Sequence, residues 1–545
     1  MENKYWIVDS NNLSNVKDIF IGYTISEDGS FYLNEKPKVL DGTGCYTCIE
    51  TFPDKIRINQ DFLGMQGIYH FKNENRHIFS NGYEKIVDYI INLKYHLSLD
   101  KNFCIQYIFS NEEPINTTDT MINEIKRIGK DYTIEISLDD KINFIENDYG
   151  VNSIKIDSKE AIEILDKWHN KWCNVFRNLV KLKSPILTDL SGGMDTRMVF
   201  GLILNSNIDK NNIIIKRNIP IKASYGKNYD DWEISQEIVN KYNYNDRSNI
   251  KYFKDKKYQD KDKEDDKLPI FEEFDNLIFG NSKICDYNSY ILTHPTFHLN
   301  GMYGDRIHLG DINETLTYVE HKKIKYKDDM KKEDIKILGD YITKYSNIII
   351  KKYESRKRPP VNLGDFSFDY IQRFFGSKIT SKFFDNDILI SPFIDPLYHK
   401  IQVLLEGTNY LYPTVALIYV RYFEGLLNFK FETDAEPRIV TKEEINFAKK
   451  MCEKYPFQKK QFDFIPDLVD KNKVVNKIVF KDEKIRNELE KRLKDGEKEF
   501  VKIFGKDYFD LAVRDFKKEN IKMQNYFTPI VSICSILNKL KKMNK

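Results

Sequence analysis

The sequence predicts an α+β sandwich in its first part, an α/β domain with a parallel sheet after it, and a helical C-terminal region. Three observations lead to this fold class. Short apolar stretches alternate with turn residues up to about residue 150. Strand and helix patterns alternate from about residue 185, as they do where helices cover a parallel sheet. The C-terminal third has helical spacing and ends in lysines, which is typical of a surface helix.

The length of the chain predicts more than one domain. Its 545 residues exceed one ordinary hydrophobic core, so we expect one domain over residues 1–155 and another over residues 156–545. Hydrophobic residues make up 41% and aromatic residues 14%, which is enough for packed globular domains.

Charge and cysteine content narrow the class of protein. The 85 basic and 83 acidic residues give a net charge of +2, so neither nucleic acid nor a membrane surface is an expected partner. Seven scattered cysteines suit a reducing compartment. We see no signal peptide, and no apolar run approaches the roughly 18 residues of a membrane span. We expect a soluble cytoplasmic protein, and no feature indicates its oligomeric state.

The expected elements follow from the spacing of apolar residues. In the first part we expect strands at residues 19–21, 31–33, 45–49, 65–71 and 78–79, and a helix at 84–97. In the second part we expect a helix carrying Ile162, Leu165, Trp168, Trp172, Phe176 and Leu179, a strand at 185–190, a helix after it, a strand at 213–215 or 221–225, and a helix around Trp232. The charged run at 254–267 is expected to be a solvated loop.

The segment Ser191-Gly192-Gly193-Met194-Asp195 lies between a predicted buried strand and a predicted helix. The first turn of a helix presents N–H groups and partial positive charge, and glycines allow close approach of an anion. This arrangement predicts a phosphate-binding loop. Neither Gly-Lys-Ser/Thr nor G-x-G-x-x-G is present, so the Walker A and dinucleotide fingerprints are excluded.

Asp195 gives the loop a carboxylate beside the expected phosphates. An acid would repel phosphate unless a cation lay between them, so we infer Mg²⁺, which prefers one or two carboxylates together with phosphate oxygens. The alternative is an ordinary helix start in which Asp195 only complements the helix dipole.

Leu190-Ser191-Gly192-Gly193-Met194-Asp195-Thr196-Arg197 resembles the Leu-Ser-Gly-Gly-x-Asp-Ser-Arg loop of the asparagine synthetase-like synthetases. These include class B asparagine synthetase, β-lactam synthetase and the lasso peptide cyclases. The resemblance implies an Ntn-hydrolase-like N-terminal sandwich and an ATP-pyrophosphatase-type synthetase domain. It also implies ATP and Mg²⁺ as cofactors, with cleavage between the α- and β-phosphates.

Three later segments resemble the same family. Residues 300–305, Asn-Gly-Met-Tyr-Gly-Asp, resemble its Ser-Gly-Asp-Gly-Gly-Asp segment, which implies Gly301 in the nucleotide site and Asp305 as a second Mg²⁺ ligand. Residues 391–395 are similar to its Pro-Phe-Leu-Asp segment and would support the site. Residues 459–462 resemble its Arg-Pro-Lys-Gln-Gly-Phe segment, which implies that Lys460 offsets charge on the reacting group. A turn aspartate and a solvated lysine are the alternatives for Asp305 and Lys460.

The N-terminal part resembles the family's glutaminase domain at residues 42–46, 61–69 and 78–81, but it departs at the nucleophile. Glutamine-using relatives begin their mature chain with cysteine, whereas this chain has Glu2. Cys45 and Cys48 lie well inside the domain, where a buried strand is the expected context. We therefore expect a degenerate domain without glutaminase activity, as in β-lactam synthetase.

A second departure is Met302-Tyr303, where many relatives have an acid and a glycine. β-Lactam synthetase has a tyrosine in this segment that helps to deprotonate the amine. Tyr303 is therefore a candidate for a general-base relay, and a packed aromatic ring is the alternative. The change makes asparagine itself a less expected product.

The resemblance implies an ATP-dependent ligase that adenylates a small-molecule or peptide carboxylate and joins it to an amine. Leu190, Thr196, Ser224 and Tyr225 would contact the nucleotide, with adenine near residues 221–225, and Arg197 would offset developing charge. Three alternatives remain open. They are an ammonia-dependent asparagine synthetase, a non-catalytic nucleotide-binding homologue, and another adenylating enzyme such as a tRNA-thiolating or NAD-forming ligase.

Overall fold

The chain is seen in a computed structural model. It describes residues 4–74, 76–109, 118–130, 132–139, 141–147, 154–216, 229–244, 253–257, 290–292, 295–304, 329–355, 386–402, 410, 412–431, 440–470, 475–479, 482–516 and 526–543.

Two antiparallel sheets form the N-terminal part. One has the strand order β1-β7-β6-β8 and the other β10-β9-β5-β4-β2-β3. The sheets share one hydrophobic core, to which Val8 and Phe79 contribute from the first sheet and Ile21 and Ile58 from the second. The strands are β1 (Ile7–Asp9), β2 (Ile19–Ile25), β3 (Phe31–Leu33), β4 (Gly44–Thr51), β5 (Lys55–Gln60), β6 (Tyr69–Asn73), β7 (Arg76–Ser80), β8 (Ile125–Arg127), β9 (Tyr132–Ser137) and β10 (Ile142–Glu146).

Most of the predicted N-terminal elements are confirmed, with two corrections. The strand expected at 65–71 begins only at Tyr69, because Gly64 and Gly67 take positive φ angles of 58° and 73° that interrupt an extended backbone. Helix α1 (Tyr83–Asn92) is shorter than expected because the chain turns at Lys94, whose φ is 62°. Helix α2 (Lys101–Phe109) follows.

A four-stranded parallel sheet lies at the centre of the second part, as predicted. Its order is β13-β12-β16-β17, and all three pairings are parallel. The strands are β12 (Ile186–Asp189), β13 (Ile213–Lys216), β16 (Thr296–Leu299) and β17 (Asp387–Ile390), and the nearby helices are α3 (Lys159–Lys181), α4 (Met194–Asn205), α5 (Tyr229–Lys241) and α11 (Pro396–His399).

Helix α3 shows why the periodicity was informative. Ser158 caps its N-terminus by accepting a hydrogen bond from the Ala161 N–H at 3.0 Å. The six apolar residues that predicted it are all buried. The expected boundary at 155/156 lies between β11 (Ile154–Lys155) and α3, and one core cluster extends across it.

The run at 254–267 was expected to be a loop, but its start is a strand. Residues 253–257 form β14 (Phe253–Lys257), which pairs in parallel with β19 (Val475–Val479), and β19 also pairs with β15 (Tyr290–Leu292). The partner strand lies more than 200 residues away, so no local pattern announced it. Residues 258–267 lie outside the described part of the chain.

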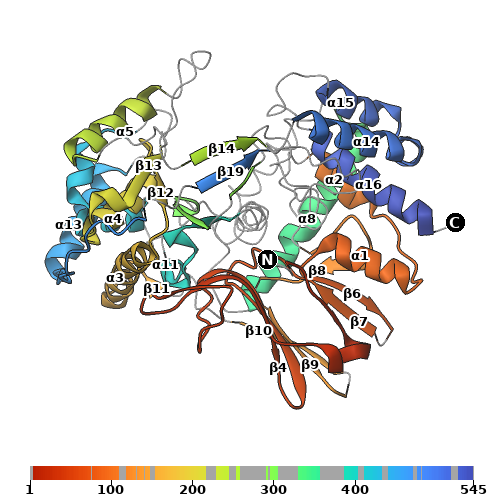
Figure 1. Cartoon of the computed structure of the whole chain (residues 1–545), viewed down its shortest axis with the longest axis horizontal. Helices are drawn as coiled ribbons and strands as arrows, with labels where there is room; N and C mark the ends of the chain where they lie inside the picture. Colours follow the sequence, from red (N-terminus) through yellow and green to blue (C-terminus); the bar gives the residue numbers. More distant parts are fainter. Residues whose placement is uncertain are drawn as a thin grey trace.

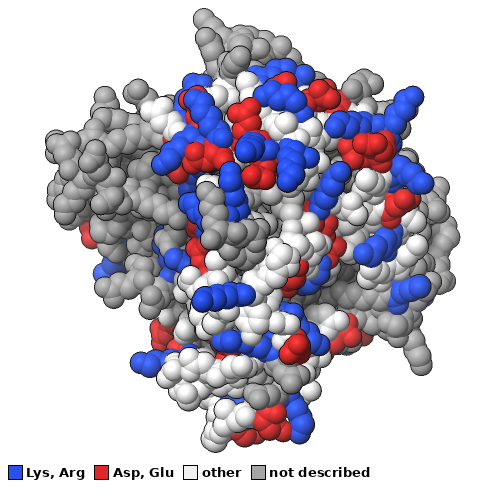
Figure 2. All heavy atoms as spheres, turned by 90° about the vertical axis from the view of Figure 1, so that its right-hand side faces the viewer, with Lys and Arg blue, Asp and Glu red and all other residues white. Residues whose placement is uncertain are grey.

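The C-terminal region is helical, as predicted. Helices α14–α16 pack with α1, α2 and α8 around a second hydrophobic core, on the right-hand side of Figure 1. Figure 2 shows this side of the molecule, where described acidic and basic side chains are interspersed. The remaining helices are α8 (Lys332–Ser355), α12 (Pro413–Tyr422), α13 (Lys442–Lys454), α14 (Asp482–Phe504), α15 (Lys506–Phe516) and α16 (Phe527–Met543), with short 3-10 turns η1 (Ser10–Asn15), η2 (Lys210–Asn212), η8 (Pro392–Ile394) and η9 (Glu424–Asn428) and strand β18 (Ile401–Gln402). None of the described helices has the length and apolar character of a membrane span.

Candidate functional site

Two glycine-containing loops meet at one edge of the parallel sheet. The loop at residues 190–193 leaves the carboxyl end of β12, and residues 300–304 leave the carboxyl end of β16 beside it. Because β13 lies on one side of β12 and β16 on the other, the chain reverses its direction of travel here. Ligands of open parallel sheets bind in the crevice at such a switch point.

Hydroxyl groups hold the 190–193 loop in shape. The Ser191 and Thr196 hydroxyls lie 2.8 Å apart, and Thr196 also accepts a hydrogen bond from the Ser191 N–H at 3.1 Å. The Gly193 N–H donates to the Ser191 hydroxyl at 3.1 Å. Two of the residues predicted to contact nucleotide thus bond to each other, while Leu190 is buried in the core behind them.

The loop already holds an anion through its backbone. The Gly192 N–H donates a hydrogen bond to the carboxylate of Asp231, on the first turns of α5. A Cβ atom on Gly192 would lie 3.1 Å from this carboxylate, so the glycine permits the close approach. A phosphate oxygen bound at this N–H would compete with Asp231.

Asp195 lies against the second loop. A Cβ atom on Gly301 would be 2.6 Å from the Asp195 Cβ, and one on Gly304 would be 2.7 Å from Asp195 Oδ1. Both glycines are therefore needed for the loops to touch, and the carboxylate is held between them. Asp305, the second predicted Mg²⁺ ligand, directly follows Gly304 but lies outside the described residues.

The described residues offer Mg²⁺ one carboxylate ligand at this site, Asp195. Among the described residues, no three His, Cys, Asp or Glu side chains gather as a metal cluster. Mg²⁺ characteristically takes one or two carboxylates and completes its shell with phosphate oxygens and water. A half-buried Asp195 next to an anion-binding N–H fits that pattern.

The segment at 391–395 supports the second loop, as expected. The Ser391 hydroxyl donates to the Met302 carbonyl at 2.6 Å, and the Tyr398 hydroxyl donates to the Gly304 carbonyl at 2.9 Å. Asp395 caps α11 and forms an ion pair with Lys171 at 2.9 Å. The two hydrogen bonds to the Met302 and Gly304 carbonyls hold the second loop in place beside Asp195.

Tyr303 turns into the core. It is 4% exposed and takes a φ of 75°, a conformation that glycine adopts without strain. Its burial matches the packed-ring alternative, and a general-base role stays a prediction.

Arg197 is fully buried and acts as a clamp. Its Nη2 atom donates to the carbonyls of Gly192 and Lys430, both at 2.6 Å, and its Nη1 atom donates to the Phe429 carbonyl at 3.2 Å. The guanidinium also stacks 4.1 Å from the centre of the Phe431 ring. Arg197 therefore positions the loop. These bonds occupy its guanidinium with backbone carbonyls, which argues against a direct contact with substrate.

The clamp also brings the backbone of an unexpected residue, Lys430, close to the loop. Lys430 is exposed, and its carbonyl shares one Arg197 nitrogen with the carbonyl of Gly192. The sequence around Lys430 resembles no phosphate-binding motif that we recognised, so only the folded chain reveals this proximity.

Lys460 lies elsewhere. It is exposed, and its Nζ atom is 5.3 Å from the centre of the Phe462 ring. The Phe462 carbonyl accepts a hydrogen bond from Asn207, just beyond the C-terminal end of α4. The 190–193 loop is at the other end of this helix, which is about 18 Å long. The structure does not bring Lys460 to the loop, and its role stays a prediction without geometric support.

A row of polar residues runs beneath the loop, of which His298 and Asp387 are buried and Asp189 is half-buried. His298 Nε2 lies 2.9 Å from Asp189 Oδ2, and its Nδ1 atom lies 3.8 Å from Asp387 Oδ1. Asp189 is the last residue of β12, directly before the loop. Strands of a buried parallel sheet are usually apolar throughout. A polar residue within each of three such strands was therefore a signal in the sequence for this row, although it was not among the predicted site residues.

Ser224 and Tyr225, predicted to lie near adenine, are outside the described residues, as is Glu2. Cys45 and Cys48 are buried in β4, and burial raises the pKa of the Cys48 thiol to about 12. Neither thiol is thus a ready nucleophile.

No protein-family model matches the sequence, and the curated proteins include no significant match. The resemblance to the asparagine synthetase-like synthetases rests on the motifs described above.

Proposed function

We propose that the protein is an ATP-dependent amide-forming synthetase. It adenylates a substrate carboxylate, releases pyrophosphate, and joins the acyl group to an amine without using glutamine. The observation that carries this proposal is the meeting of the two glycine loops on Asp195, at the carboxyl edge of adjacent parallel strands.

The backbone supports a role in binding the phosphates. The Gly192 N–H is directed at a carboxylate, so it is oriented toward an anion, and the N-terminus of α4 adds partial positive charge. Asp195 and Asp305 would hold Mg²⁺, which when bound offsets the charge of the phosphates.

The nitrogen source is a free amine in this proposal. Position 2 is Glu2 where glutamine-using relatives have their nucleophilic cysteine, and Cys45 and Cys48 are buried. The amine attacks the acyl-adenylate carbonyl and gives up one proton to water, the C–N bond forms, and AMP leaves with the electrons of the acyl–oxygen bond.

The direct test is ATP–pyrophosphate exchange with a panel of acids: aspartate, N-substituted amino acids, sugar acids and acidic peptides. Asp195→Asn should lower the exchange rate by about 10²-fold or more while the circular dichroism spectrum stays unchanged, because an electrostatic group of this kind is typically worth 10²–10³-fold. Asp157→Asn, an exposed aspartate before α3, is the matched control and should exchange at the wild-type rate. Full exchange by the Asp195 variant would overturn the metal assignment.

The same assay tests Lys460 and the alternatives. Lys460→Met should lower exchange if Lys460 offsets charge on the reacting group, and exchange at the wild-type rate would exclude that role. Exchange with aspartate and product formation with ammonium would indicate asparagine synthesis. Nucleotide binding that Asp195→Asn weakens, without exchange for any acid, would indicate a non-catalytic homologue, an outcome consistent with the buried Tyr303.

A further inference from the structure

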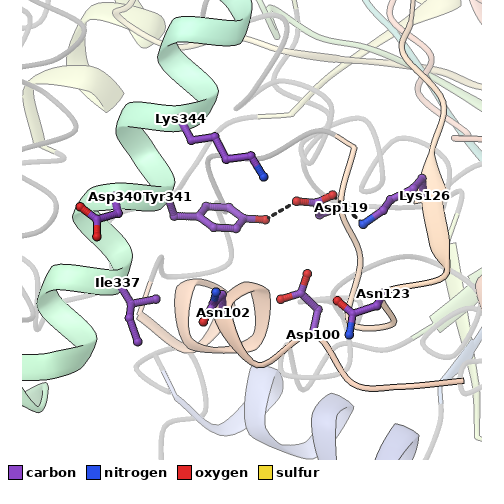
Figure 3. A pocket seen from close by; sticks show the side chains of 9 residues that line it. All are labelled: Asp100, Asn102, Asp119, Asn123, Lys126, Ile337, Asp340, Tyr341 and Lys344. Atoms are coloured by element: carbon purple, nitrogen blue, oxygen red, sulfur yellow. Dashed lines mark hydrogen bonds and ion pairs between the residues drawn. The ribbon is translucent and has the colours of Figure 1, made fainter.

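A cavity lies between the N-terminal part and α8, away from the phosphate loop. Its volume is about 410 Å³, within the range of small-molecule sites. Helix α2 and the segment that leads into β8 form one wall, and α8 forms the other (Figure 3). The lining residues are Asp100, Asn102, Asp119, Asn123, Lys126, Ile337, Asp340, Tyr341 and Lys344.

Asp119 forms the fixed back of the cavity. It is 9% exposed, and it accepts hydrogen bonds from Lys126 at 2.9 Å, from the Tyr341 hydroxyl at 2.8 Å and from Tyr345. Burial opposes its ionisation, but the bonds from Lys126 and Tyr345 hold the pKa of Asp119 below its ordinary value. The back wall therefore carries a fixed ionised carboxylate with its own partners.

Acceptors gather on one side of this wall. One oxygen of Asp100 accepts the Phe103 N–H at 2.9 Å, and Figure 3 shows its carboxylate pointing into the cavity. The Asn123 amide nitrogen donates to the Ser98 hydroxyl at 3.0 Å and to the Leu99 carbonyl at 3.1 Å, so the oxygen is the end of this amide directed at the cavity.

A positive charge faces them from α8. Figure 3 shows the Lys344 ammonium directed toward the bond between Tyr341 and Asp119, whereas Asp340 points away. Asp100 and Lys344 thus approach the same space from opposite walls. Burial and the charge of Asp119 raise the pKa of Asp100, so the ionised Asp100 would gain from a cation beside it.

We propose that this cavity binds a small zwitterionic molecule of the amino-acid type, with its ammonium group at Asp100 and its anionic group at Lys344. A metal ion fits less well, because the described residues contain no cluster of three metal-ligating side chains. An organic ammonium needs only separate acceptors, which Asp100 and Asn123 provide. The proposal does not depend on the synthetase function.

A ligand bound in this cavity would contact two separate parts of the chain. Asp100 belongs to the N-terminal part and Lys344 to α8, so a ligand that contacts both would hold α8 against α2. We expect binding to protect the amides of α2 and α8 from hydrogen exchange.

The test uses titration calorimetry of the full-length protein with glycine, β-alanine, γ-aminobutyrate and 5-aminopentanoate. Propylamine and butyrate serve as probes with one charge each. We expect saturable binding of at least one amino acid of the series and weaker binding of both single-charge probes. Asp100→Asn keeps the ability to cap α2, and Lys344→Gln keeps a polar side chain. Each should weaken binding about tenfold or more, because it removes a charge-assisted hydrogen bond.

Lys336→Gln is the matched control, since Lys336 is exposed on α8 and does not line the cavity. It should bind as the wild type does. Absence of saturable binding across the series would overturn the proposal. Wild-type affinity in both the Asp100 and the Lys344 variants would also overturn it. Hydrogen exchange of α2 and α8 provides a second readout, and unchanged protection at a saturating concentration of the ligand would exclude the bridging geometry.

Discussion

At the scale of single residues, Asp61 is a buried carboxylate of the N-terminal part that is held by backbone N–H groups. It is fully buried and accepts the N–H groups of Leu63 at 3.0 Å, Met65 at 3.1 Å and Tyr46 at 3.3 Å. Burial raises the pKa of Asp61 to about 7, although these bonds favour the ionised form. The sequence motif around Asp61 was recognised, but its complete enclosure follows only from the packing of both sheets.

This raised pKa predicts a pH dependence of stability. Between about pH 4 and pH 7 the folded chain holds a proton on Asp61 that the unfolded chain has lost, so the free energy of unfolding falls as pH rises. Relative to Asp61→Asn, the wild type should lose roughly 1.4 kcal/mol per pH unit across this window. Denaturant unfolding at pH 5, 6, 7 and 8 measures the difference. The exposed Asp54→Asn should follow the wild-type profile, and parallel profiles for Asp61→Asn and wild type would contradict the assignment.

At the scale of elements, the contact between α5 and the 190–193 loop leads to a prediction about anion binding. Asp231 occupies the Gly192 N–H that a phosphate oxygen would use. Asp231→Asn should therefore strengthen pyrophosphate binding about fivefold, since one like charge about 4 Å away in water costs about 1 kcal/mol. Glu233→Gln, an exposed acid on the same helix, controls for the change in net charge. Weaker binding by Asp231→Asn would show instead that Asp231 organises the loop.

The sequence predicted those elements whose signals are local. The apolar stripe of α3, the buried strand β12 and the glycine turn into α4 each lie within about 25 neighbouring residues. Contacts made by tertiary packing escaped prediction, namely Asp231 at Gly192, Lys430 under Arg197, and the pairing of β14 with β19. The resemblance gave Lys460 a role at the reacting group, whereas its neighbour Phe462 is bonded to Asn207 beyond the C-terminal end of α4. The role of Lys460 stays a prediction.

At the scale of the whole molecule, there are two hydrophobic cores, and each combines segments that are far apart in the sequence. One joins the N-terminal sheets to the parallel sheet, and the other joins α1 and α2 to α8 and α14–α16. In Figure 1 the last helices lie beside α1 and α2, so helices from the first and last parts of the chain share one core. The lysines at the C-terminus predicted a surface helix, but α16 has a buried side that packs against α14 and, farther back in the sequence, against α2.

Gly496 allows a close contact between two helices of this second core. It lies in α14, and a Cβ atom there would be 2.5 Å from the Cα of Cys534 in α16. Alanine favours a helix over glycine by about 1 kcal/mol, so an isolated α14 would gain from Gly496→Ala. In the folded chain the added methyl group meets backbone, and overpacking of this kind typically costs about 1–3 kcal/mol.

We therefore expect Gly496→Ala to lower the free energy of unfolding of the second core. Thermal unfolding and hydrogen exchange of α14 and α16 measure the change. Asp495→Ala is the matched control, because Asp495 is exposed on the same helix and its change adds helix propensity without a clash. If both variants were stabilised alike, α14 and α16 would not cross at Gly496. If Gly496→Ala, but not Asp495→Ala, also increases the hydrogen exchange of α1 and α2, the effect reaches elements about 400 residues away through the shared core. The C-terminal helices would then stabilise α1 and α2 in the N-terminal part.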